Sequence, residues 1–471
     1  MSDLHYLSAT EAVALFQTRD LSPVELMAAV IARAEAVEPT INAFSETFFD
    51  QAMERAREAE RAYLRGEARP LEGIPVAIKE EMRIAGHRMR LGSLVVDEIA
   101  DDTATVVQRI FDAGGIMHAR TTTPEFSSQI FTHSRLWGVT RNPWNPDLTP
   151  GGSSGGSGAA LAAGSTTLAT GSDIGGSIRI PATFCGVVGF KPPYGRVPQD
   201  PVDNLDTYCH NGPLARTVDD AALLENVIAG PDPRDIATLR PKLELPLSYE
   251  GIEGWRVAVS PDLGCYDVDD EVRANTLAAA AALREAGATV VEVSLPWRRD
   301  DIRRAALIHY AVGMADWVAT IAAGRTDDLN PYVLAFTSEG EGLELDAVAE
   351  GVALEAGLYP PLGELLEGVD ALLCPTMAVT GLLAGDDEAA SHAEINGLPA
   401  GDGYDITMAI PFNIMSRCPV VNVPSGFASN GIPTGLQIVA RTFDDERAFR
   451  VAAALERVRP WLDSPERRPK M

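Results

Sequence analysis

Apolar residues recur three or four positions apart along most of the first seventy residues, which is the spacing of one helical face. Ser22, Pro23 and Glu25 form a start signal for one such helix, because serine caps free N–H groups, proline fits the first turn and glutamate completes a capping box. A charged, amphipathic helix is predicted from Thr47 to Leu64. The region 1–70 is therefore predicted to be helical packing without chemistry.

Beyond residue 70, short apolar runs alternate with amphipathic segments, the pattern of strands and helices in an α/β fold. The apolar runs predict strands at 76–78, 116–119, 187–191, 255–259, 288–293, 370–374, 420–423 and 436–440. Helical spacing predicts helices at 103–113, from Thr217 onward, at 269–285, through most of 300–368 and at 444–458. Segments without either pattern are interpreted as loops: 192–216, 230–253 (a surface excursion) and 380–404.

Length and composition bound the number of domains. The chain has 471 residues, 46% of them hydrophobic, which suffices for a large buried core. Length alone suggests two or three domains. No linker divides the chain and no internal repeat is visible, so one large domain stays open as the alternative.

Charge and cysteine content exclude several classes of protein. The formal net charge of −28 at pH 7 argues against nucleic acid or an anionic membrane as a partner. No run of 18 apolar residues is present, and the N-terminus lacks a signal-peptide pattern, so no membrane association is expected. Five scattered cysteines without a C-x-x-C pair indicate reduced thiols, a cytoplasmic location and no metal site.

One stretch, 150–181, differs from its surroundings: P-G-G-S-S-G-G-S-G-A-A-L-A-A-G-S-T-T-L-A-T-G-S-D-I-G-G-S-I-R-I-P. Its nine glycines would ordinarily indicate a flexible linker. Its interior segments A-A-L-A-A-G and T-L-A-T are apolar, however, and small buried residues let backbones approach closely. We interpret the stretch as a rigid, buried element that presents serine hydroxyls.

Two familiar uses of such a stretch fit poorly. A phosphate-binding loop needs the lysine of G-x-x-x-x-G-K-[ST], and this stretch contains none. A Ser-His-Asp hydrolase needs G-x-S-x-G on a strand-turn-helix elbow. That pattern occurs twice within 151–156, but Pro143, Pro146 and Pro150 forbid a strand leading into it.

The stretch as a whole resembles the signature of the amidase signature family of serine hydrolases. Other segments resemble the same family in the same order: G-I-P-V-A-I-K-E, R-T-T-T-P-E-F, G-V-T-R-N-P-W-N, D-A-L-L-C-P-T, C-P-V-V-N-V-P-S-G and G-I-P-T-G-L-Q-I-V. The resemblance covers most of 70–220 and 370–455. It implies a single α/β domain over 1–471, in which a mixed central sheet is flanked by helices on both sides. Its parts would be N-terminal helices (1–70), a catalytic core (71–220), a divergent region forming much of the substrate pocket (230–410), and closing strands with a helix (411–460).

Matched position by position, the resemblance implies a catalytic triad. Ser177, at the end of D-I-G-G-S, matches the nucleophile, Ser153 matches a bridging serine that follows a cis peptide bond, and Lys79 matches the base. A serine hydroxyl attacks only after a base takes its proton, and a lysine serves only when neutral, which burial favours. Taken alone, Lys79 at a strand end would more simply be a lysine that reaches out to solvent.

The turn around Ser177 implies further roles. The expected oxyanion hole consists of the backbone N–H groups of Ile174, Gly175, Gly176 and Ser177. The expected supporting polar residues are Ser154, Asp173 and Arg179, although a purely structural role for the last two stays open. The expected substrate contacts are Ser172 and Gly152.

Several other residues carry less weight or depart from the family pattern. Cys185 is interpreted as a core thiol, and the histidines at 133, 210 and 309 lie outside any motif. The pair Glu80-Glu81 departs from the commoner continuation after the lysine, which leaves open how that loop is held. The segment Met89-Arg90-Leu91 also departs, and its larger side chains are expected to reshape the substrate channel.

The reaction that follows is hydrolysis of a linear amide through an acyl-enzyme on serine, without a metal or organic cofactor. Expected substrates are aryl or alkyl amides, carbamates and esters, handled by a monomer or homodimer. The aromatic and apolar residues of the divergent region favour an apolar substrate but fit core packing equally well: Trp317, Tyr332, Leu334, Phe336 and Tyr359. Two alternatives are the glutaminase subunit of a tRNA-dependent amidotransferase and a non-catalytic binding protein on the same fold.

Overall fold

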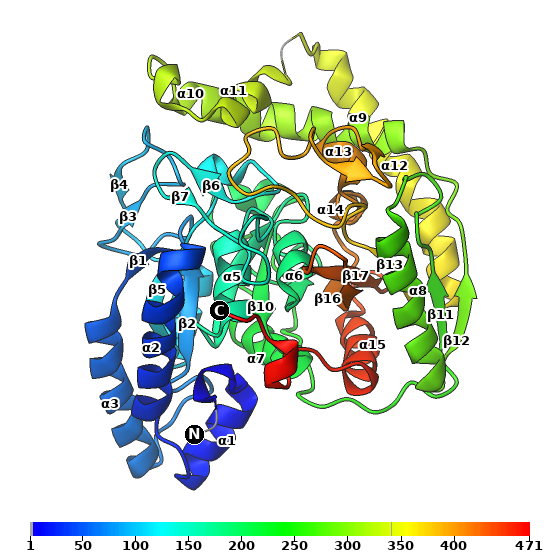
Figure 1. Cartoon of the computed structure of the whole chain (residues 1–471). Coiled ribbons are helices and arrows are strands. Elements are labelled where there is room, and N and C mark those ends of the chain that lie inside the picture. The colour runs from blue at the N-terminus through cyan, green and yellow to red at the C-terminus, as the bar shows by residue number, and fades with distance from the viewer. Residues whose placement is uncertain (1–2, 341) are drawn as a thin grey trace.

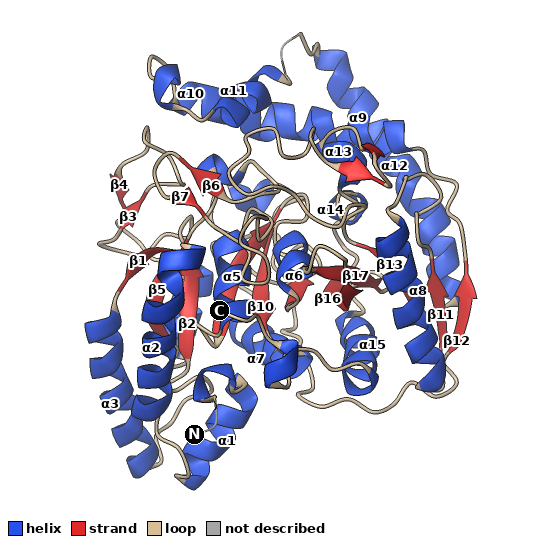
Figure 2. Ribbon diagram, in the orientation of Figure 1, coloured by secondary structure: helices blue, strands red, loops and turns tan. Residues whose placement is uncertain are grey.

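An eleven-stranded mixed sheet extends through the whole molecule (Figure 2). The computed structural model describes residues 3–340 and 342–471. In spatial order the strands are β1 Phe44–Thr47, β5 Ile116–Thr121, β2 Pro75–Lys79, β8 Leu168–Asp173, β10 His210–Ala215, β9 Val188–Lys191, β16 Val420–Phe427, β17 Pro433–Val439, β13 Ala371–Pro375, β11 Arg256–Val259 and β12 Thr289–Glu292. β2 is parallel to β5 and β8, β11 is parallel to β13 and β12, and the other neighbours are antiparallel. Strands from residues 44 to 439 share one sheet, so the single α/β domain is confirmed.

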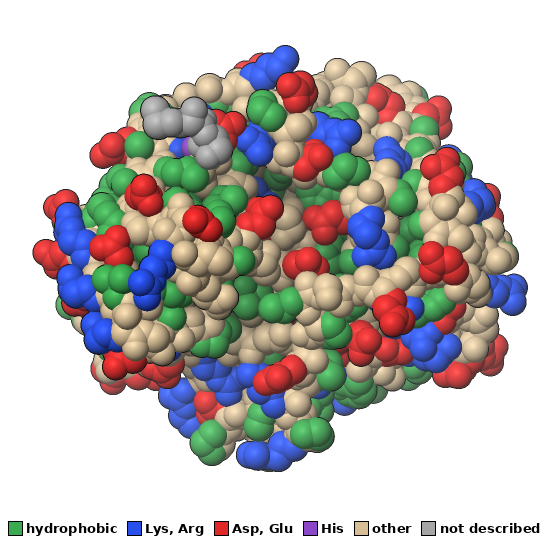
Figure 3. Space-filling model, turned by 90° about the horizontal axis from the view of Figure 1, so that it is seen from below, with side chains coloured by type: hydrophobic (Ala, Val, Ile, Leu, Met, Phe, Trp, Pro, Cys, Tyr) green, Lys and Arg blue, Asp and Glu red, His purple; other side chains and the backbone are tan. Residues whose placement is uncertain are grey.

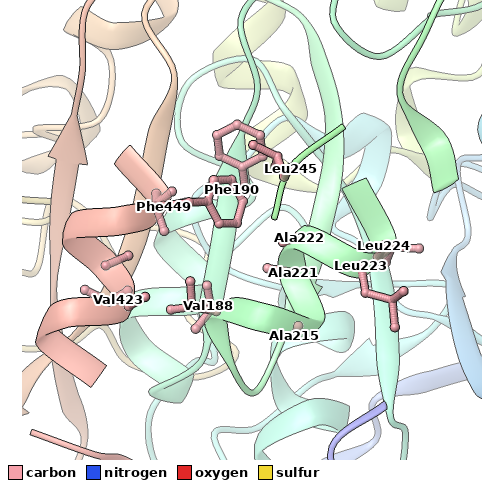
Figure 4. Packing of buried hydrophobic residues seen from close by; sticks show 14 of the residues in the cluster. Val188, Phe190, Ala215, Ala221, Ala222, Leu223, Leu224, Leu245, Val423 and Phe449 are labelled. Carbon is pink, nitrogen blue, oxygen red and sulfur yellow. The ribbon is translucent and has the colours of Figure 1, made fainter. Parts of the chain in front are cut away.

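Helices cover both faces of this sheet because its buried strands alternate their side chains between two apolar clusters. Val76 and Ile78 of β2 pack with the helices α4 and α7, whereas Ala77 between them packs with α5. Figure 4 shows Val188 and Phe190 of β9 among side chains of α7 and α15. One face carries α5 Gly155–Ala163 and α6 Arg179–Cys185; the other carries α4 Thr105–Asp112, α7 Val218–Ile228, α8 Asp270–Glu285 and α15 Asp445–Val458.

Two further groups of helices lie at opposite ends of the molecule (Figure 1). The N-terminal group is α1 Ala9–Thr18, α2 Pro23–Ile41 and α3 Phe49–Arg65, and α2 begins with the predicted capping box of Ser22 and Glu25. The second group comes from the divergent region: α9 Arg299–Tyr310, a π-helix at Ala311–Ala315, α10 Asp316–Ile321, α11 Pro331–Ser338 and α12 Leu345–Gly368. The short elements are β3 Arg88–Met89, β4 Glu98–Ile99, β6 His133–Ser134, β7 Gly138–Val139, β14 Glu394–Ile395, β15 Leu398–Pro399, α13 Gly403–Ile406 and α14 Pro411–Ile414.

Two strands of the central sheet, β10 and β1, lie where the sequence predicts another structure. The stretch before Arg216 was interpreted as a loop, but it contains the central strand β10, although Gly212 and Pro213 interrupt its apolar pattern. β8 pairs with β10 along its whole length, whereas β9 reaches only Leu214 and Ala215 of β10, so Pro213 has no partner on the β9 side. β1 was assigned to the N-terminal helical region, and its four residues at the sheet edge are too few for a periodicity to show.

Charged side chains are distributed over the surface. On the face drawn in Figure 3, acidic and basic side chains are interspersed around apolar ones. No helix of the described residues is long and apolar enough to cross a membrane.

The helix α5 lies unusually close to the sheet because its first turn consists of small residues. A Cβ added to Gly156 would lie 2.5 Å from the backbone oxygen of Ala43 and 2.5 Å from the backbone nitrogen of Thr122. Such contacts are too short for any side chain, so the glycine sets the distance between α5 and the neighbouring strands.

We therefore expect Gly156→Ala to lower the free energy of unfolding by about 1–3 kcal/mol through overpacking. The matched control is Gly357→Ala in the exposed part of α12, where an added Cβ has no neighbour within 4 Å. That change should raise stability by about 0.5–1 kcal/mol. Chemical denaturation of both variants measures the difference, and equal effects would contradict the packing argument.

Candidate active site

Lys79 is the last residue of β2, and all five residues of that strand are buried. It points to the same side as Ala77, toward α5, because alternate residues of a strand share a face. Its Nζ lies 2.7 Å from Ser153 Oγ and 2.8 Å from Ser172 Oγ, and its backbone N–H donates to Thr170 Oγ1. The lysine is therefore held inside the protein and does not extend to solvent.

The charge of Lys79 is governed by two opposing influences. Burial lowers the pKa of its ammonium below the ordinary value, and the carboxylate of Glu81 opposes this from 3.1 Å. The net direction is downward, toward the neutral amine that a base requires. The contact with Glu81 was not predicted, although the unusual Glu80-Glu81 pair was the signal that could have indicated it.

Ser153 lies two residues before α5, and the peptide bond between Gly152 and Ser153 is cis, as the resemblance implies. Among the described residues no strand leads into this turn, which agrees with the three prolines that precede it. Gly152 was expected to contact substrate, but it lines neither cavity described below. A Cβ at Gly152 would lie 2.4 Å from the carbonyl oxygen of Phe131, so close backbone packing explains the glycine.

Ser177 stands in the second turn of the stretch, between β8 and α6, with 8% of its surface exposed. The backbone N–H of Ser154 donates to the carbonyl oxygen of Ser177 at 3.2 Å, and Ser154 Oγ contacts the carbonyl oxygen of Ser172 at 3.4 Å. Ser154 thus joins the two turns. Within the described residues, Ser153 Oγ and Ser177 Oγ form no hydrogen bond with each other in this structure.

The four backbone N–H groups expected to form the oxyanion hole differ in whether they are already hydrogen-bonded within the protein. The N–H of Gly176 donates to Asp173 Oδ1 at 2.8 Å, so in this structure it is already engaged. No hydrogen bond to another described residue is found for the N–H groups of Ile174, Gly175 and Ser177. These three donors are the ones that a developing oxyanion could use.

Asp173 and Arg179 form a fully buried ion pair that holds this turn. Arg179 donates two hydrogen bonds to the Asp173 carboxylate, at 2.8 and 2.9 Å, and also contacts Asn413 and Gln437. Burial alone would raise the pKa of Asp173, but the Arg179 guanidinium and the Asn413 amide hold it well below its usual range. The carboxylate also accepts from the N–H of Ile178. The pair therefore orients the backbone on both sides of Ser177.

Two cavities meet at the serines. The larger, about 790 Å³, is lined by Ser153 and Ser172; the smaller, about 500 Å³, is lined by Gly175 and Ser177. Ser127, Ile174 and Met314 line both. A carbonyl carbon next to Ser177 could therefore extend one substituent into each cavity. Ser127 belongs to the T-T-T-P-E-F-S-S segment, whose place at the site was not predicted.

The divergent region contributes residues to both cavities. Trp317 lines the larger cavity, Tyr332 and Phe336 line the smaller, and Leu334 and Tyr359 line neither. Met89 and Leu91 also line the larger cavity.

The remaining candidates are accounted for by ordinary packing and pairing. Cys185 is buried, and all five cysteines are free. His133 contacts Asp387, His210 contacts backbone carbonyl oxygens, and His309 contacts Asp206. Of these histidines, only His309 lines a cavity. Among the described residues, no group of three or more His, Cys, Asp or Glu side chains is placed to hold a metal ion.

The model of the Amidase family matches residues 25–449. This chain belongs to the amidase signature family. It is 36% identical to an acylamidase of Rhodococcus erythropolis, over 98% of this chain and 97% of that protein. It is also 35% identical to one subunit of the glutamyl-tRNA(Gln) amidotransferase of Synechococcus sp. (strain CC9605), over 93% and 94% of the two chains.

Solved structures with a similar fold belong to the same family. A bacterial aryl acylamidase of the amidase signature enzymes matches with a TM-score of 0.90 and 28% identity, over 98% of both chains. The relatives thus include proteins named for different reactions. Membership in the amidase signature family supports an amidase that acts on carbon–nitrogen bonds, but it does not specify the substrate.

The buried ion pair gives a test of how this turn is held. Asp173→Asn should lower the free energy of unfolding by about 3–5 kcal/mol at pH 7, because it leaves the Arg179 cation buried without its counter-charge. Since the folded-state pKa of Asp173 is depressed, its contribution is present above the unfolded pKa of about 3.9 and is lost as pH falls further. The difference in the free energy of unfolding between wild type and Asp173→Asn should therefore become smaller as the pH falls below about 3.9.

The control is Asp262→Asn, which removes an ion pair of the same 2.8 Å length, with Arg273, whose side chains are 32% and 36% exposed. Its loss should cost at most about 1 kcal/mol. Urea unfolding at several pH values measures both, and a similar cost at the two sites would refute the argument.

Proposed function

We propose that this protein hydrolyses linear amides, with Ser177 as nucleophile, Ser153 as proton relay and Lys79 as base. The observation that carries the proposal is the 2.7 Å contact between Lys79 Nζ and Ser153 Oγ at the junction of two cavities. Family membership supports the same assignment.

The proposed reaction follows from this arrangement. Neutral Lys79 accepts the Ser153 proton while Ser153 accepts the Ser177 proton, and Ser177 Oγ bonds to the substrate carbonyl carbon. The carbonyl oxygen becomes an oxyanion facing the free backbone N–H groups of the turn. Ser153 then returns a proton to the amine as the carbon–nitrogen bond breaks. Water repeats the sequence on the acyl-enzyme and releases a carboxylic acid.

The lining of the cavities supports a neutral or cationic substrate with an apolar body. Aromatic and apolar side chains such as Phe126, Trp317 and Phe336 provide the contact area. Acidic side chains also line the two cavities: Glu81, Asp200, Asp203, Asp206, Glu339, Glu355, Asp387, Glu388 and Asp402. Among the described residues of these linings, Arg83 is the one lysine or arginine, and it is paired with Asp102.

This charge balance favours aryl or alkyl amides, and by the same chemistry carbamates and esters, over a substrate with a free carboxylate. Glutamine, the amide donor of the tRNA-dependent amidotransferase alternative, carries such a carboxylate. We therefore place this protein with the acylamidases. Preferred turnover of glutamine over neutral anilides would reverse that choice.

Replacing the proposed catalytic groups should abolish turnover without unfolding the protein. We expect Ser177→Ala to reduce anilide hydrolysis to background and Lys79→Ala to lower kcat roughly 10²–10⁴-fold. Ser165→Ala, in the same stretch but with its hydroxyl donating to the carbonyl oxygen of Ala160, should keep normal activity.

Labelling gives an independent test of the nucleophile. A fluorophosphonate should modify Ser177, and mass spectrometry of the labelled peptide would identify the modified residue. Near-normal turnover by Lys79→Ala would exclude it as the base, and failure to label the folded protein would favour the non-catalytic alternative.

Substrate charge gives a second test. The kcat/KM for 4-acetamidobenzoate should be lower than for its neutral isostere 4-acetamidobenzamide by at least about tenfold, because the acidic linings repel the carboxylate. Higher ionic strength should narrow the gap, since salt screens exposed charges. Equal kcat/KM values at low salt would contradict the proposed selectivity.

A further inference from the structure

A carboxylate stands beside the proposed base on the cavity side. Glu81 follows β2 by two residues, and its Oε2 lies 3.1 Å from Lys79 Nζ. The hydroxyl of Ser127 donates to the same oxygen. The Glu81 side chain is 17% exposed and lines the larger cavity together with Ser153 and Ser172. Glu81 therefore belongs to the site and not to the packed interior behind the sheet.

The surroundings of Nζ restrict how a neutral amine can be oriented. Nζ has three polar neighbours, which are Ser153 Oγ, Ser172 Oγ and Glu81 Oε2. An ammonium can donate one hydrogen to each of them, whereas a neutral amine has two hydrogens and one lone pair. A carboxylate only accepts hydrogen bonds, so the lone pair cannot face Glu81. It must face Ser153 or Ser172, and the first of these orientations is the one that a base acting on Ser153 requires.

We propose that Glu81 is a positioning residue for Lys79, whose carboxylate binds one Nζ–H of the amine and directs the lone pair toward the serine hydroxyls. This role rests on the proposed function of Lys79 as the base. It accounts for the acidic residue at a position where the sequence departs from the family pattern.

The negative charge of Glu81 has a second consequence. It stabilises the protonated lysine, so it raises the pH above which the neutral base forms. Two further groups raise the pKa of Lys79: Asp173 from β8, whose charge is paired with Arg179, and Cys209 before β10. The charge of Glu81 in turn raises the pKa of Asp203.

The remaining nearby charges are directed elsewhere. Arg120 of β5 donates to the carbonyl oxygens of Glu80 and Met82, and Arg83 pairs with Asp102. Glu80 accepts from the backbone N–H of Arg90. Glu81 is therefore the carboxylate in direct contact with Lys79 among the described residues.

The test compares Glu81→Gln with Glu80→Gln, which removes the same charge one residue away. The amide introduced by Glu81→Gln keeps an acceptor oxygen but carries no charge, so the acid limb of the kcat/KM profile should move about 1–3 pH units lower. Glu80→Gln should leave that limb in place. Glu81→Ala should lower kcat more than it changes KM, and Glu81→Gln should restore part of the loss. An unmoved limb in Glu81→Gln, or a change confined to the KM of cationic substrates, would overturn the proposal.

A readout without turnover separates this proposal from the proposed function. The chain has four lysines: Lys79, Lys191, Lys242 and Lys470. Protein labelled with ¹³C-lysine should therefore give few side-chain signals, and the Lys79 signal is the one missing in Lys79→Met. Its titration midpoint should fall in Glu81→Gln, while that of Lys191, also buried, stays constant. An unchanged Lys79 midpoint would refute the role of Glu81 even in an active enzyme. A lowered midpoint in a protein that hydrolyses no amide would refute the function instead.

Discussion

The burial of one lysine amine at the end of a strand is the constraint on which the site depends. An ammonium in the interior is costly unless it is paired, so burial favours the neutral form that a base requires. The fold provides this burial with β2, which is flanked by two strands and covered by α5. The polar atoms around Nζ then determine where its lone pair points. A lysine exposed at the same strand end would be charged and unable to accept a proton.

Bringing a serine to that amine requires the helix α5 to approach the sheet. Its glycines and alanines allow this approach, because larger side chains would meet the backbone of β5 and its neighbours. Ser157 anchors the helix to the sheet, because its hydroxyl donates to the carbonyl oxygen of Thr170 and contacts Thr121 Oγ1. The Asp173–Arg179 pair supplies a fixed point next to this helix and binds the second turn to Asn413 of α14 and Gln437 of β17. Segments far apart in the chain therefore fix the positions of Ser153 and Ser177 relative to each other.

Much of this could be predicted from sequence because local patterns carry it. A short apolar run indicated β2, and the small-residue stretch indicated a buried element with two turns. β10 was missed because Pro213 breaks the local pattern, and its pairing is visible only once β8 and β9 stand beside it. The contact of Glu81 with Lys79 was missed for a similar reason. It depends on the path of the chain after the strand, which residue types alone do not specify.

The same distinction explains why the chemistry is more predictable than the substrate. The proposed reacting groups come from two continuous segments, 75–79 and 150–181, whose residues resemble those of the family. The cavity walls come from η3 Asp203–Leu205, α9–α11 and the loop near Asp387, which meet only in the folded protein. No local pattern predicts that so many carboxylates converge there beside an arginine that is already paired. Selectivity would therefore depend on distant segments that share one cavity, whereas the proposed reactivity depends on β2 and on the two turns of 150–181.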